Sequence, residues 1–139
     1  RTELSPTLAT EIMRLTMLVG EAMTIGLNKR GIDIGRINYQ DNGNWAVFKP
    51  EGPAMHIHLY GRARSAKVHK YGEACYFPFR ETGFYDGFEP LTPEDIAEIQ
   101  TELQRLLKQD KYKISNWKGL KLFPDFLFPE RAVIVVQQL

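Results

Sequence analysis

Polar and apolar side chains alternate along Ala54-Met55-His56-Ile57-His58-Leu59-Tyr60-Gly61-Arg62, the stretch that decides how we expect the chain to fold. Successive side chains of a β-strand point to opposite faces of its sheet. One face then carries apolar side chains that enter the core: Met55, Ile57 and Leu59. The other face carries four polar residues: His56, His58, Tyr60 and Arg62. Two imidazoles, a phenol and a guanidinium side by side offer a nucleophile or base, a proton donor and a ligand for an anion.

Length and composition predict one globular domain over residues 1–139. We expect a helix and the motif strands in residues 1–62, then an aromatic loop, a second helix and a C-terminal strand in residues 63–139. The net charge of +1 argues against bulk binding to nucleic acid or to an anionic membrane. No apolar run approaches the roughly 20 residues of a membrane helix. The single cysteine, Cys75, excludes an internal disulfide and fits a reducing compartment such as the cytoplasm.

Two helices are marked by their first residues. Ser5-Pro6 provides an N-cap and a proline at the first helical position, and an apolar stripe follows, so we expect a helix over Pro6–Asn28. Thr92-Pro93 has the same form, with acidic residues in the first turn, and predicts a second helix that ends near Lys111.

The remaining segments predict strands and turns. We expect a strand over Ile32–Tyr39 with a bulge at Gly35, a tight turn over Asp41–Asn44, and a short strand over Trp45–Lys49. The β-branched run Arg131–Val136 predicts a strand that is buried on both faces or completes the sheet. Together with the histidine strand, these elements predict an α+β fold, an antiparallel sheet with packed helices.

The segment from Ala63 to Pro90 is rich in glycine, proline and aromatic residues. It is too aromatic for a disordered linker and too interrupted for regular structure. Long ordered loops of this kind serve as lids, binding loops or interface arms. The alternative is that the aromatic rings only hold the loop to the body of the domain.

Three kinds of role are open to His56 and His58. They are suitable ligands for zinc, iron or copper, but a metal site needs a third ligand, and neither His69 nor Asp33 has a spacing that supplies one. They are also compatible with a structural role, as hydrogen-bonded histidines on a half-buried strand. Finally, a neutral imidazole can attack a phosphate and form a covalent intermediate that water hydrolyses. Donors to the phosphate oxygens are needed for that reaction.

The motif residues, together with the preceding helix and strand, resemble the second half of a histidine triad (HIT) domain. The segments that carry this resemblance are Leu4-Ser5-Pro6, Ile32–Asn38 and Gly52–Arg62. With Arg62 as the anchor, His56 matches the middle histidine of the family motif, which is the nucleophile that forms a nucleotidyl-histidine intermediate. The resemblance implies contact with phosphate or the leaving group for His58. It implies substrate binding for Asn38. Arg62 and Tyr60, which we expect on the same face as the histidines, are candidate phosphate or substrate ligands by their chemistry alone.

The sequence departs from the family at several positions. Ala54 stands where the first histidine belongs, and only its backbone carbonyl is available to orient the nucleophilic ring. Glu51-Gly52-Pro53 offers no side-chain donor where the family has phosphate donors. The family's base-pocket strands have no counterpart before Arg1, which implies a truncated chain or a remodelled member. Everything after Ala63 lies outside the resemblance and would form a C-terminal extension.

The resemblance therefore implies a hydrolase or nucleotidyl transferase that acts on a dinucleoside polyphosphate or a nucleoside phosphoramidate. It further implies a homodimer, a nucleotide substrate, and no cofactor. Two alternatives stay open: a nucleotide-binding module that has lost turnover, as Ala54 suggests, and a His-x-His metal-binding protein.

Overall fold

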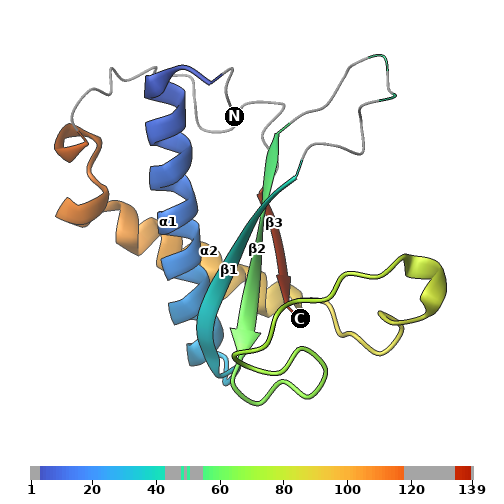
Figure 1. Cartoon of the computed structure of the whole chain (residues 1–139). Coiled ribbons are helices and arrows are strands. Elements are labelled where there is room, and N and C mark those ends of the chain that lie inside the picture. Colours follow the sequence, from blue (N-terminus) through green and yellow to red (C-terminus); the bar gives the residue numbers. More distant parts are fainter. Residues whose placement is uncertain (1–3, 43–47, 49, 51–54, 118–133, 139) are drawn as a thin grey trace.

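Two helices pack beside a three-stranded sheet in the computed structural model, which describes residues 4–42, 48, 50, 55–117 and 134–138 (Figure 1). Along the chain the helices and strands are α1 (Pro6–Lys29), β1 (Ile34–Asn42), β2 (His56–Ala63), α2 (Pro93–Leu107) and β3 (Ile134–Gln138). Short 3₁₀ turns lie between and after them: η2 (Arg80–Thr82), η3 (Asp110–Tyr112) and η4 (Ile114–Asn116). The mixture of packed helices and sheet confirms the predicted α+β class.

Both helices begin where the sequence predicted. At the start of α1 the Ser5 hydroxyl accepts a hydrogen bond from the Leu8 amide at 3.2 Å. Thr92 and Asp95 form a reciprocal capping box at the start of α2. However, α2 does not continue to near Lys111 as expected. It ends at Leu107, and the chain turns through η3, because Tyr112 leaves the helix axis to bury its ring and reach α1.

The sheet is mixed, with the strand order β1-β2-β3. β1 and β2 are antiparallel, as predicted, but β3 pairs with β2 in parallel. The expectation of a wholly antiparallel sheet is therefore wrong for the third strand. The physical reason is the long connection after β2, which includes α2 and gives the chain the length that a crossover between parallel strands requires.

Gly35 lies at an irregularity of the sheet that sets which side chains face the core. The register with β2 shifts between Ile34 and Arg36, which confirms the predicted bulge. Because of this shift, Ile34 and Ile37 are both buried although they are three residues apart. Arg36 and Asn38 consequently face the opposite side of the sheet.

β1 is longer than predicted. It continues to Asn42, which pairs with His56, so the first half of the expected turn at Asp41–Asn44 belongs to the strand. The rest of that turn, the expected strand Trp45–Lys49 except for Phe48, and residues 118–133 lie outside the described residues. The last strand does complete the sheet, from Ile134 onward.

The core lies between α1, the sheet and α2. Its centre consists of fully buried apolar side chains, including Leu18, Met23, Leu27, Leu59 and Leu106. The two helices approach closely at Gly26, where a Cβ atom would lie 3.1 Å from the Ile99 backbone. None of the described helices has the length and apolar character needed to cross a bilayer.

Ion pairs at the edge of this core join α1 to α2. Lys29 binds Glu98 at 3.1 Å and also contacts Glu102. The Lys29 ammonium lowers the pKa of Glu102, and the Arg105 guanidinium lowers it further. At the start of α2, the Thr92 backbone N–H and then the Arg30 guanidinium lower the pKa of Asp95.

Candidate functional site

Three rings stand in a row on one face of β2. The ring centroids of His56 and His58 are 5.0 Å apart, and those of His58 and Tyr60 are 5.7 Å apart with nearly parallel planes. Leu59, between them in sequence, is fully buried in the core. The alternation predicted from the sequence is therefore confirmed, and the two histidines remain only partly buried.

β1 places a second row of polar residues beside these rings. In the antiparallel register Asn38 is opposite Tyr60, and Gln40 is opposite His58. Directly opposed residues of neighbouring strands share a face of the sheet. Asn38 was predicted as a site residue, whereas Gln40 was missed, although the same alternation along β1 would have placed it here.

Arg62 lies at the end of the ring row but points into the protein. It is only 4% exposed. Its guanidinium donates to the backbone carbonyls of Lys70 at 2.8 Å and Glu73 at 2.9 Å, and to that of His69 at 3.3 Å. Nη1 donates to the Cys75 sulfur at 2.8 Å. The partners of Arg62 are therefore the groups of the following loop, so its main role in this structure is to hold residues 69–75 against the sheet.

Cys75 joins this loop to the polar face. Besides Arg62, the Asn38 side-chain amide donates to its sulfur at 3.3 Å. Cys75 also affects the pKa of Tyr60. Burial raises the pKa of the Tyr60 phenol, and the neighbouring Cys75 and Tyr85 raise it further. Tyr60 is therefore a neutral proton donor across the physiological pH range.

The aromatic loop packs on itself and on the end of the ring row. The Phe77 ring lies 4.9 Å from that of Tyr60. His69 is buried within the loop, where its Nε2 is 2.8 Å from the Tyr76 carbonyl oxygen and its ring contacts three phenylalanines. These are Phe77, Phe84 and Phe88. The rings do hold the loop to the body, and whether it also acts as a lid stays a prediction.

The two candidates for a third metal ligand are each hydrogen-bonded to other groups. His69 belongs to the aromatic cluster, and Asp33 accepts bonds from the backbone and hydroxyl of Ser65. Within the part of the chain that the structure describes, no three His, Cys, Asp or Glu residues are grouped to hold a metal ion.

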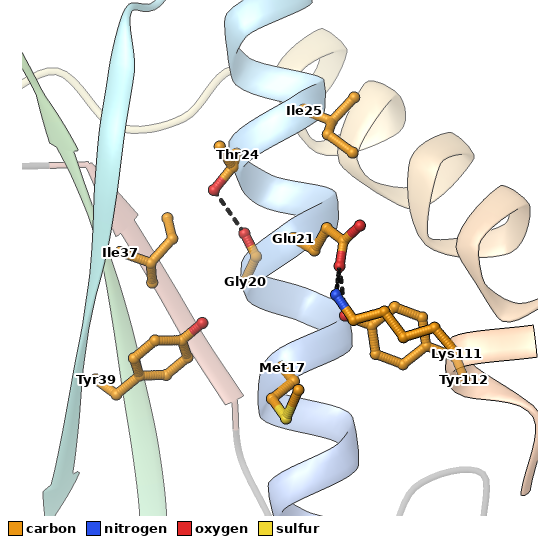
Figure 2. Close-up of a pocket in the computed structure, with 9 residues that line it drawn as sticks. All are labelled: Met17, Gly20, Glu21, Thr24, Ile25, Ile37, Tyr39, Lys111 and Tyr112. Atoms are coloured by element: carbon orange, nitrogen blue, oxygen red, sulfur yellow. Dashed lines mark hydrogen bonds and ion pairs between the residues drawn. The ribbon is translucent and has the colours of Figure 1, made fainter. Parts of the chain in front are cut away.

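A hollow lies on the side of β1 away from the histidines, against α1 (Figure 2). This cavity of about 470 Å³ is lined mainly by α1 and by Ile37 and Tyr39. The Tyr39 hydroxyl lies over Gly20, where a Cβ atom would be only 2.0 Å from it. At its rim Lys111 and Tyr112 both bind the Glu21 carboxylate, which lowers the pKa of Glu21. The hollow faces away from the histidines and is not part of their site.

Ala54, the predicted carbonyl donor, lies outside the described residues. The remaining predicted residues lie along one face of two paired strands: Asn38, His56, His58, Tyr60 and Arg62. Arg36 and Cys75 were missed as neighbours of this face. Arg36 shares its alternation, but nothing local in the sequence signals the contact between Cys75 and Arg62.

Comparison with known proteins identified no relative of this chain. No protein-family model matches the chain, and no significant match was found among curated proteins or among solved structures. The likeness to histidine triad proteins therefore stays a prediction from the motif.

Proposed function

We propose that this chain is a histidine-triad-like enzyme that cleaves a nucleotide at its α-phosphorus through a nucleotidyl-histidine intermediate. The observation that carries the proposal is the row of His56, His58 and Tyr60 on one face of β2, with spacings of 5.0 and 5.7 Å between neighbouring rings. A strand that presents two partly buried imidazoles and a neutral phenol together provides a nucleophile and proton donors at one place.

In the first step a ring nitrogen of His56 attacks the α-phosphorus. An N–P bond forms while the bond from phosphorus to the leaving oxygen or nitrogen breaks, and the leaving group takes a proton from a neighbouring donor. In the second step water attacks the same phosphorus, the N–P bond breaks, and a nucleoside monophosphate leaves. An alcohol or phosphate acceptor in place of water would make the reaction a transfer.

The other residues of the site have supporting roles in this reaction. His58 is next to His56 and Tyr60, so it is suited to donate to the phosphoryl oxygens or to the leaving group. Asn38, opposite Tyr60, positions the substrate. Arg62 acts through the loop that it holds and is a positioning residue. Ala54 contributes its backbone carbonyl.

The test is direct detection of the intermediate. The protein is mixed with diadenosine tetraphosphate or adenosine phosphoramidate, quenched in alkali because N–P bonds are labile in acid, and digested for mass spectrometry. We expect adenylate on His56 and none on His58. His56→Asn should abolish the adduct and turnover, while its circular dichroism spectrum matches that of the wild type.

Other outcomes favour the alternatives. If nucleotide binds but neither adduct nor turnover is found, the chain is a binding module, as Ala54 in place of a histidine would suggest. An activity that is lost in chelator but survives His56→Ala would instead indicate a metal site.

A further inference from the structure

A polar cavity of about 480 Å³ lies beside β1 at the Arg62 end of the histidine strand. It is lined by residues of β1, β2 and the loop that follows: Arg36, Ile37, Asn38, Tyr39, Arg62, Tyr71, Gly72 and Glu73. Tyr71 forms its wall by packing on the bulge, since a Cβ atom on Gly35 would be 2.6 Å from the Tyr71 ring. The cavity is thus shaped by the same irregularity that directs Arg36 to this face.

Two arginines line this cavity, one of them exposed (Arg36) and the other buried (Arg62). Arg36 and Arg62 are directly opposed in the β1–β2 register. Like charges at opposed positions of neighbouring strands destabilise the pair. Among the described residues neither arginine forms an ion pair, and the hydrogen bonds of Arg62 go to carbonyl groups and a thiol. An anion in the cavity would offset both positive charges.

The surroundings also favour an anion. Asn38 offers an amide donor and Tyr71 a phenol, both suited to phosphoryl oxygens. Three more exposed basic residues follow β2 within eight positions of Arg62: Arg64, Lys67 and Lys70. The opposing charge at the cavity is Glu73, which is exposed. Basic side chains in and beside the cavity outnumber this carboxylate, and guanidiniums bind phosphate with paired hydrogen bonds.

We propose that this cavity binds a phosphate or pyrophosphate group, with Arg36 supplying the donors and Arg62 a fixed charge. Arg62 is six residues from His56 along β2, or about 20 Å at the rise of a strand. Neighbouring phosphates of one polyphosphate chain are too close together to lie at both places. The cavity is therefore an anion site separate from the histidines.

The first experiment measures anion binding alone, with inorganic pyrophosphate as the probe in isothermal titration calorimetry. We expect Arg36→Gln to weaken binding about tenfold or more, as loss of a charge-assisted hydrogen bond would. Arg36→Lys should retain part of the affinity, and Glu73→Gln should increase it. Arg80→Gln, an exposed arginine of η2 that does not line the cavity, is the matched control and should bind like the wild type. Equal affinity in Arg36→Gln and wild type would overturn the site.

The second experiment asks whether this anion site is separate from the histidines. In a His56→Asn background, Arg36→Gln should weaken pyrophosphate binding as much as it does in the otherwise wild-type chain. If that effect disappears in the His56→Asn background, the anion binds at the histidines and the cavity site is refuted.

Discussion

Arg62 provides a sharp test of how the site is held, through the substitution Arg62→Met. Methionine keeps an unbranched apolar stem but removes every hydrogen bond to His69, Lys70, Glu73 and Cys75. Each such bond contributes about 1 kcal/mol net, and carbonyls left buried without a partner cost more. The gain from removing a buried charge without a counter-charge opposes this loss. We therefore expect a decrease of about 2–4 kcal/mol in the free energy of unfolding, concentrated in residues 69–75.

Two measurements separate this anchoring role from direct phosphate binding. Urea unfolding gives the total loss, and amide hydrogen exchange shows where it falls, with protection expected to drop in residues 69–76 and to persist in α1. Arg62→Lys should also loosen the loop, because one ammonium group cannot span acceptors that a guanidinium fork reaches together. If Arg62→Met keeps its stability within about 0.5 kcal/mol and its loop protection unchanged, the anchoring role is refuted.

Three further predictions concern the body of the fold. Leu106→Ala, at a fully buried position of α2, should destabilise by about 2–5 kcal/mol in urea unfolding, whereas Ile96→Ala on the same helix, at 46% exposure, should cost under about 1 kcal/mol. The lowered pKa values of Asp95 and Glu102 mean that the unfolded chain binds these protons more tightly. Stability should therefore fall as the pH drops below about 4, and Glu102→Gln should flatten that decline. Burial raises the pKa of Tyr112 to about 12, so its phenol should ionise late in a titration followed by absorbance at 295 nm. The free energy of unfolding should decline as the pH rises from about 10 to 12. Tyr112→Phe should remove that late absorbance step.

Local signals in the sequence were sufficient for part of this structure. The caps at Ser5 and Thr92 act through bonds within three residues, so the first turns of both helices were predictable. The same holds for the alternation in β2 and for the bulge at Gly35, which depend on side-chain direction and backbone freedom at single positions.

Long-range contacts account for what could not be predicted. The parallel addition of β3 to β2 depends on the path of the chain through α2, and α2 itself ends early because Tyr112 reaches Glu21, which is 91 residues away. The partners of Arg62 come from a loop without regular structure. A charged residue at a strand end predicts an exposed anion ligand, and only the fold of that loop turns it into an anchor.

Asn38 connects the two parts of the candidate site. Its side chain lies on the same face as the ring row, lines the polar cavity, and donates to Cys75 at 3.3 Å. A phosphoryl oxygen is a stronger acceptor than a thiol sulfur, which is weak in that role. An anion in the cavity would therefore compete for the Asn38 amide, while Arg62 keeps Cys75 and the loop in place. Because Arg62 and the ring row belong to one strand, the position of the loop, the shape of the cavity and the placement of His56 depend on the same pairing of β1 with β2.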